Sequence, residues 1–541
     1  MLLKNEQKNN FIKQAGILAA AGIISRIIGL LYRSPLHGVI GSLGLGYYQS
    51  AYNYYTIILL ISSYSIPAAI SKVIAQKLAV KEYRNAHRIF KCALWYVLMV
   101  GGIASLFLYF CAGIFVAPEA IPVLRTFAPT IFVYGILGVL RGYFQAHGSM
   151  VQTSVSQILE QIANAVVSIS AAYLLIYSVM GTMEMPAEEG ARVMRATNGA
   201  IGSALGTGAG VLIALLFMLA VYLLNKGLMD RRILADEHEK EDSYGKILKA
   251  ITSIVTPFIL STAVYNLSGA VNNTIYTKIF PMFRETAGVD IYSGWGVFAG
   301  QALTISNIPI AFASAMASAM IPSVAAHMAE KNVEKAKEKI GLAIKTTMLI
   351  SIPCAVGVFA LARPITAFLF PRNLAAEETM ATYLLMALAL SVVFYALSTL
   401  SSSILQGLGK VNAPIFNAGF ALIGQTLLAL GLLLFTNLDL YSIAIANTVY
   451  AGIMCWLNQR SVRKAVGYRQ EIKQTFVIPG IAAICMGLIA RVAYQALLLW
   501  SGSLVLALIL SVLLGALVYF AIMLLTGGLK AEALFRKYRK K

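Results

Sequence analysis

Long apolar runs recur along this chain at a length that fits membrane-spanning helices. A helix needs about 20 apolar residues to cross the hydrocarbon core of a bilayer, and 14 such runs fit into the 541 residues. Of all residues, 59% are hydrophobic and only 12% are charged, a balance that a soluble protein of this size does not need. The sequence therefore predicts an all-α integral membrane protein.

The expected spans cover most of the chain and leave short connections. They are placed at residues 11–32, 45–70, 92–116, 122–146, 151–178, 198–225, 250–280, 294–325, 341–362, 378–405, 411–435, 439–459, 475–499 and 502–526. Lysines and arginines gather in alternate connections and in the C-terminal tail, which is the positive-inside pattern. We therefore expect both termini in the cytoplasm. The net charge of +20 is explained by these loops, so we expect no nucleic-acid partner.

Two pairs of similar segments indicate an internal repeat. Pro67 and Pro322 are each followed by small residues and a charged stretch, and Gln145 and Gln406 each precede a glycine at a tight turn. Repeats of this kind organise many transporters. We predict two six-helix lobes that form a V-shaped cavity, followed by a helix pair: residues 1–229, a cytoplasmic linker 230–249, residues 250–466, and residues 467–541 with the last two spans and a basic tail.

Ala329–Lys345 alternates lysine and glutamate at helical spacing. Such i,i+4 pairs support an exposed helix, so we predict a short helix lying at the cytoplasmic surface.

Arg26 lies inside the first apolar run and Arg33 near its end. A guanidinium stays protonated, and a charge inside a spanning helix costs from about 3 to more than 10 kcal/mol. Arg26 therefore either snorkels or pairs within the protein, or it lines a water-filled cavity and meets an anion. A similar choice applies to Arg491 in the thirteenth span, for which snorkelling or structural pairing is the expectation.

Arg141 and Glu160 flank the turn at Gly148 at similar distances along the chain. The hairpin of the fourth and fifth spans would hold them at comparable depth, so they are expected to form an interhelical ion pair. The alternative is functional: Glu160 titrates or binds a cation and releases Arg141 during a transport cycle.

Neutral polar side chains concentrate in the second, seventh and eighth spans. We select Gln49, Asn53, Asn272, Gln301 and Thr304. Their default role is hydrogen bonding between helices, and the alternative is a polar cavity suited to a sugar with a phosphate.

Tyr47, Tyr48, Tyr52 and Tyr54, beside Gln49 and Asn53, are expected to contribute in part to an interfacial aromatic belt.

Several absences narrow the chemistry. The sequence has no GxxxxGK[ST] loop for nucleotide hydrolysis, and its five histidines have neither metal-ligand nor triad spacing. We therefore expect no enzyme, no cofactor and no metal. Transport would be driven by an ion gradient, the membrane potential or consumption of the substrate.

Four runs carry a family resemblance: SRIIGLLYR from Ser25, AYNYYTIILLISSYSIPAAISK from Ala51, LRGYFQAHGSMVQTSVSQILEQI from Leu140 and ILQGLGKVNA from Ile404. They resemble the stage V sporulation protein B and MurJ-type polysaccharide exporters of the multidrug/oligosaccharidyl-lipid/polysaccharide superfamily. The resemblance implies a 14-helix, two-lobed fold in a bacterial plasma membrane. It also implies flipping of lipid II, the undecaprenyl-diphosphate-linked peptidoglycan precursor, which Arg26 would meet at its diphosphate.

The resemblance carries over unevenly to individual residues. Arg26 and Asn53 match family positions in the first two helices. Arginines that Gram-negative members carry later in the second helix and in the eighth are replaced here near Thr56 and Thr304, which makes Arg33 and Arg141 candidate substitutes. The last two spans would match the family's groove for the lipid tail.

These observations leave several functions open. The first is lipid II flipping, and the second is export of another lipid-linked oligosaccharide such as a capsule, teichoic or spore-cortex precursor. A cation-coupled drug exporter and a non-transporting envelope scaffold are further alternatives. We expect a monomer surrounded by membrane lipids, with cell-wall synthesis proteins as candidate partners.

Overall fold

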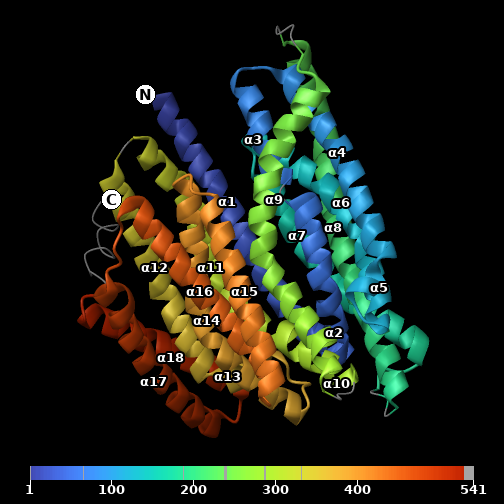
Figure 1. Ribbon diagram of the computed structural model, residues 1–541, viewed down its shortest axis with the longest axis vertical. Coiled ribbons are helices and arrows are strands. Elements are labelled where there is room, and N and C mark those ends of the chain that lie inside the picture. Colours follow the sequence, from blue (N-terminus) through green and yellow to red (C-terminus); the bar gives the residue numbers. More distant parts are fainter. Residues whose placement is uncertain are drawn as a thin grey trace. The chain divides into compact units, whose positions relative to one another are not determined.

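The computed structural model describes residues 2–64, 66–184, 186, 188–236, 241–284, 288–330 and 332–528. Every regular element in these ranges is a helix (Figure 1), as the sequence predicts. The chain separates into two compact units, which are described one at a time below. Unit 1 comprises Met1–Thr274 with Thr286–Gly296, and unit 2 comprises Ile275–Glu285 with Val297–Lys541.

Twelve helices in the described ranges are long and apolar enough to cross a membrane. They overlap every predicted span except the first and the seventh, and several extend beyond the predicted bounds. The first corresponds to the shorter apolar segment Gly16–Leu31, and the seventh to helix α9 (Tyr244–Thr274). The membrane class is thereby confirmed, and the count of 14 stays a prediction.

Unit 1 is built around a buried apolar core between its long helices. Its elements are α1 (Leu2–Leu31), α2 (Arg33–Leu59), a π-helix (Leu60–Tyr64), α3 (Ile66–Ala79), α4 (Tyr83–Phe110), α5 (Ala112–Phe115), a 3-10 turn (Pro118–Ala120), α6 (Ile121–Ala146), α7 (Val151–Met180), α8 (Glu189–Leu234), α9 and α10 (Gly288–Trp295).

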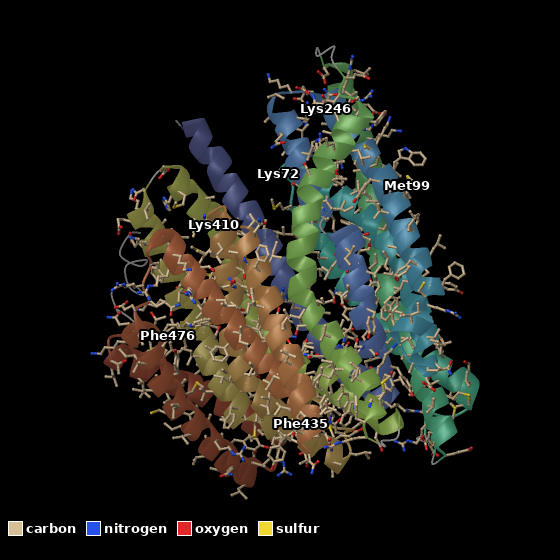
Figure 2. The ribbon with its side chains drawn as sticks, in the orientation of Figure 1. Lys72, Met99, Lys246, Lys410, Phe435 and Phe476 are labelled. Atoms are coloured by element: carbon tan, nitrogen blue, oxygen red, sulfur yellow. The ribbon has the colours of Figure 1, made fainter. Side chains whose placement is uncertain are left out.

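Unit 2 begins with a π-helix and a 3-10 turn and resumes with a second π-helix, whose first residue, Gly296, is the last residue of unit 1. Most of its α-helices contribute to one apolar core. Its elements are the π-helix Ile275–Ile279, the 3-10 turn Phe280–Met282, the π-helix Gly296–Ala302, α11 (Leu303–Ala329), α12 (Val333–Ala360), α13 (Ala362–Leu369), α14 (Ala375–Gly407), α15 (Asn412–Phe435), α16 (Leu440–Val466), a π-helix (Lys473–Val477), α17 (Ile478–Ser501) and α18 (Leu504–Leu525). Lys410 and Phe435, labelled in Figure 2, mark the two ends of α15.

Two helices begin earlier in the chain than the spans predicted for them. Residues 33–44, the connection left between the first two predicted spans, are helical apart from a kink at Gly41, whose φ of 70° and ψ of 178° suit glycine. Arg195 of α8 donates to the Val39 carbonyl at 2.8 Å and so satisfies a backbone group beside this kink. The lysine and glutamate stretch is helical from Val333, as predicted, but it is the first part of α12, which runs unbroken to Ala360, and not a separate short surface helix.

The two turns expected to be equivalent share one hydrogen-bond pattern. Gly148 donates to the Gln145 carbonyl at 3.0 Å, and Gly409 donates to the Gln406 carbonyl at 3.0 Å. Both glycines have positive φ, 77° and 74°, a conformation that ends helices and that glycine adopts without steric cost. The prediction of a tight turn at both places is confirmed, and the lobe boundaries inferred from the repeat stay a prediction.

Helices α7 and α8 pack at very short range through glycines at every fourth residue of α8. A Cβ atom on Gly202, Gly206 or Gly210 would lie 2.3 Å from the Ala172 nitrogen, 2.1 Å from Ser168 Oγ and 2.5 Å from the Glu160 carbonyl oxygen, respectively. Small residues at this spacing let two backbones approach closely in a membrane. The glycine stripe therefore fixes the position of Glu160 along α7.

The described part of the linker is tied to unit 1 by charges. Asp242 bonds Lys77 at 2.6 Å and Lys246 at 2.8 Å, while Lys77 also bonds Glu82 at 2.7 Å. Asp236 caps α4 by accepting from the Arg84 backbone N–H at 2.7 Å. Lys246 and Lys72 lie at the same end of unit 1 (Figure 2), so this end carries a dense cluster of charges.

In unit 2, Arg491 of α17 donates to the carbonyl of Ala360, the last residue of α12, at 3.0 Å. A cation is stabilised at a helix C-terminus, so the expected structural pairing of Arg491 is confirmed.

We predict that Gly206→Val lowers thermal stability in detergent, because its methyl groups would meet the backbone of α7. Overpacking of this kind costs about 1–3 kcal/mol. Gly227→Val, on the same helix where a Cβ meets nothing within 4 Å, is the matched control. Equal melting temperatures for the two variants would contradict the close α7–α8 packing.

We predict that Asp242→Asn loosens the start of α9. Hydrogen bonds from Lys246 and Lys77 hold the Asp242 pKa below its usual value, so its stabilising contribution is present above the ordinary carboxyl pKa of about 4 and is lost as pH falls through the lowered value. Hydrogen exchange at pH 7 should be faster in the first turns of α9. Glu334→Gln, at an exposed position in unit 2, serves as the control. Unchanged exchange in Asp242→Asn would show that the ion pairs of Asp242 with Lys77 and Lys246 do not hold the start of α9.

Candidate functional site

A cavity of about 230 Å³ lies inside unit 1. It is walled by α1, α2, α6, α7 and α8, and its lining is mostly polar or aromatic. The lining residues are Gly29, Tyr32, Arg33, Tyr48, Tyr52, Tyr55, Thr56, Leu59, Leu60, Tyr134, Glu160, Gln161, Asn164, Thr207 and Val211. The structure thus brings Arg33 and Glu160, two residues selected from the sequence, to one cavity.

Arg141 and Glu160 form the predicted interhelical ion pair. Arg141 Nη2 donates to Glu160 Oε2 at 2.8 Å, and Arg141 Nε donates to Ser156 Oγ at 2.9 Å. The Arg141 side chain is 5% exposed and that of Glu160 is 16% exposed, so the arginine is buried behind the glutamate. Glu160 therefore contacts the buried Arg141 guanidinium and also lines the cavity.

One wall of the cavity is an aromatic cluster around Phe127 of α6. The rings of Tyr48, Tyr52 and Tyr55 lie 5.4, 5.8 and 4.8 Å from the Phe127 ring, centroid to centroid. The Tyr48 hydroxyl also lies 3.2 Å from Thr207 Oγ1. Rings at these separations attract one another beyond simple burial, so the cluster stiffens the wall.

The expected aromatic belt is wrong for these tyrosines. Tyr47, Tyr48 and Tyr54 are 2%, 3% and 9% exposed, whereas a belt residue sits at the lipid interface. Tyr52, half-buried, lines the cavity. The polar stretch of α2 therefore faces the inside of unit 1.

Arg26 lies on α1, one helical turn before the cavity residue Gly29. Its side chain is exposed, and it makes no hydrogen bond or ion pair to any other residue that the structure describes. Residues three and seven apart share a helix face, so Arg26, Gly29 and Arg33 follow one line toward the cavity.

The selected amides of unit 1 lie outside the cavity lining. Gln49 and Asn272 are 7% and 2% exposed, and Asn53 is half-buried with its Oδ1 facing Gly269 of α9. Their neighbour Asn273 donates to Ser50 Oγ at 3.0 Å, a hydrogen bond between α9 and α2. The structure therefore places Asn53 and Asn273 at the contact between α2 and α9, whereas Gln49 of α2 and Asn272 of α9 are buried.

Gln301 and Thr304 belong to unit 2. Gln301 exchanges two hydrogen bonds with Asn373, of 3.0 and 2.9 Å, and Thr304 donates to the Ala299 carbonyl at 3.1 Å. A reciprocal amide pair satisfies both partners, so these contacts stabilise the π-helical start of α11.

Sequence reasoning missed the polar residues that complete the cavity, chiefly Gln161, Asn164 and Thr207. One signal was available, since Glu160 and Asn164 are four residues apart and so share a face of α7. Thr207 carried no such signal, because it sits in a run of small residues on α8.

Comparison with known proteins places this fold. A sequence model of the family described as "Lipid II flippase MurJ" matches residues 84–515. The chain belongs to the MurJ family. Among curated relatives, Lipid II flippase MurJ of Bacillus subtilis (strain 168) is 24% identical over 499 residues, covering 88% of this chain and 87% of the relative. Stage V sporulation protein B of the same organism is 23% identical over 492 residues, covering 88% of each.

Solved structures agree at the level of fold. "Lipid II flippase MurJ, inward closed conformation" has a TM-score of 0.65 at 15% identity, covering 97% of this chain and 99% of that one. An outward-facing multidrug resistance MATE family transporter of the MOP superfamily has a TM-score of 0.60 at 17% identity, covering 84% and 96%. The chain is therefore a multi-pass bacterial membrane transporter of the MurJ family and not an enzyme, and it is a flippase for a lipid-linked precursor.

We predict that Arg141→Gln destabilises unit 1 more than the double change Arg141→Gln with Glu160→Gln. Removing one partner of a buried pair strands the other charge and costs about 3–5 kcal/mol, whereas removing both leaves neutral groups. Melting temperatures in detergent of the wild type, both single variants and the double variant complete the cycle. A double variant that melts at or below the temperature of Arg141→Gln alone would contradict the burial of this ion pair.

Proposed function

We propose that this protein flips lipid II from the inner to the outer leaflet by alternating access. Family membership supports a lipid-linked precursor as the cargo, and the cavity of unit 1 supports a contact with the anionic diphosphate of that cargo. The observation that carries the proposal is that Arg33 lines this cavity beside Thr56, the region where the family resemblance leads one to expect an arginine. Arg33 thus supplies a guanidinium to the same wall from a different helix position.

Arg26 is proposed as the first contact with the diphosphate. Its charge has no protein partner among the described residues. This is expected of a guanidinium whose counter charge is supplied by a bound anion. A guanidinium can bind a phosphate through two parallel hydrogen bonds, and Arg33 lies two turns further toward the cavity. The diphosphate would be passed from Arg26 to Arg33 along this face.

Glu160 is proposed as the coupling group. When it is ionised, it neutralises Arg141 at 2.8 Å and adds a negative charge to the cavity wall. When it binds a proton or another cation, Arg141 loses its counter charge and the cavity becomes more favourable for an anion. The cycle would therefore tie cation binding to diphosphate binding at one cavity.

Asn53 and Thr304, each half-buried in its own unit, stay proposed as polar contacts to the glycan. Gln49, Asn272 and Gln301 are buried, so they stay proposed only as contacts that a rearrangement of the helices would expose. Amides and hydroxyls suit a sugar because they donate and accept without adding charge.

A second candidate cargo is another undecaprenyl-diphosphate glycan. The nearly equal identity to MurJ and to Stage V sporulation protein B of Bacillus subtilis favours keeping it. The diphosphate is common to both cargoes, so the arginines do not distinguish them.

We predict that Arg26→Ala and Arg33→Ala each lower the initial flipping rate of labelled lipid II in proteoliposomes by at least tenfold, while membrane insertion is unchanged. Arg363→Ala is the control, because it removes one exposed arginine, paired with Glu378, from another part of the chain. Unimpaired flipping by both variants would eliminate the proposed diphosphate contact.

We predict that Glu160→Gln flattens the pH dependence of flipping, because an amide keeps a hydrogen bond with Arg141 but cannot titrate. The rate should be measured across pH 5–8 with and without a sodium gradient. A wild-type pH profile in the variant would exclude Glu160 as the coupling group.

Complementation identifies the cargo. Growth of a strain depleted of its lipid II flippase, restored by this protein, would support lipid II. Rescue confined to another lipid-linked glycan pathway would support the second candidate.

A further inference from the structure

Unit 1 contains a second cavity, of about 550 Å³, between α4, α6 and α8. It shares no lining residue with the cavity of Arg33 and Glu160. Its wall is apolar along one side, formed by Leu94, Ile136, Leu140 and Leu219. A volume of this size accommodates a ligand of ordinary small-molecule dimensions.

Charged groups stand at the same cavity. Lys91 on α4 and Lys226 on α8 line it together with Asp230, so the fixed charges sum to a net positive site. Neither lysine is paired with a carboxylate among the residues that the structure describes. The cavity thus combines unneutralised cations with an apolar wall, the two parts that an anionic amphiphile needs.

His87 adds an unsatisfied polar atom. Its Nδ1 is buried and has no hydrogen-bond partner within the described part of the chain. Leaving such an atom unpaired is energetically unfavourable. The His87 side chain lines the cavity, so it adds a polar group to the wall beside the two lysines.

The cavity adjoins a face of α4 that is suited to lipid. Trp95, Met99 and Ile103 are 67%, 65% and 65% exposed and follow Lys91 at intervals of four residues, so all four lie on one face of the helix. Figure 2 shows Met99 pointing away from the helices of unit 1. A lysine at the end of an apolar stripe is the arrangement in which the amine reaches the headgroup layer.

We propose that this cavity binds an anionic glycerophospholipid of the inner leaflet, namely phosphatidylglycerol. Its phosphate would lie between Lys91 and Lys226, and part of an acyl chain would cover the apolar wall. Basic pockets between helices on the cytoplasmic side bind anionic headgroups, and the cytoplasmic position rests on the positive-inside orientation. Asp230 favours a headgroup with hydroxyl donors, because a carboxylate accepts hydrogen bonds.

Such a lipid would be a bound component of unit 1 and not cargo. It would contact α4, α6 and α8 at once, near the charged end of the unit that also holds the linker. The inference therefore goes beyond the proposed transport function, and its test does not require flipping.

The experiment measures lipid binding to the purified full chain in detergent. Phosphatidylglycerol, phosphatidylethanolamine or phosphatidylcholine is added, and bound lipid is counted by native mass spectrometry alongside the melting temperature. Phosphatidylglycerol should be retained at least fivefold more than phosphatidylcholine and should raise the melting temperature most. Equal retention of all three lipids would overturn the proposal.

Two kinds of variant locate the site. Lys91→Gln with Lys226→Gln should reduce phosphatidylglycerol retention at least fivefold, while Lys72→Gln with Lys249→Gln, which removes the same charge from outside the cavity, should not. Leu219→Trp should reduce retention by filling the cavity at unchanged charge. Equal losses in the two lysine pairs would show non-specific attraction and refute the site, as would normal retention in both the Lys91/Lys226 pair and Leu219→Trp.

Discussion

An arginine in a membrane keeps its charge, so the protein must supply a counter charge or bind one. Unit 1 shows both solutions. Arg141 is neutralised inside the protein by Glu160 at 2.8 Å, while Arg26 has no partner among the described residues. The cavity between them has Arg33 and Glu160 in its lining. In the proposed function, Glu160 is the group that changes charge, and it lies between Arg141, its ion-pair partner in this structure, and the arginines that would bind the anion.

Unit 1 contains two separate cavities, and their linings suit different parts of a lipid. The smaller cavity is polar and aromatic and supports a role in moving a diphosphate, whereas the larger one joins lysines to an apolar wall and supports a resident phospholipid. The glycine contacts hold α7 and α8, two walls of the smaller cavity, at a fixed distance, since any side chain at Gly206 would push Ser168 and its helix away. The proposed transport cycle therefore needs both the fixed packing of α7 against α8 and a change in the charge of Glu160.

Hydropathy and helical spacing predicted much of this fold, because the bilayer fixes helix length and because hairpin distances set which charges meet. That reasoning located the Arg141–Glu160 pair and the turns at Gly148 and Gly409. It failed where contacts come from distant segments: the tyrosines of α2 are buried because Phe127 on α6 packs against them. It also failed at α12, because ion-pair spacing marks a helix without telling where that helix ends.

The position at which the diphosphate contacts the chain can be measured directly. An undecaprenyl-diphosphate glycan carrying a photoreactive group next to its phosphates should be cross-linked to the full protein in nanodiscs and the modified peptides identified. We expect labelling in the peptides that contain Arg26, Arg33 and Glu160, and competition by unlabelled lipid II. Labelling confined to other helices, with these peptides unmodified, would contradict it.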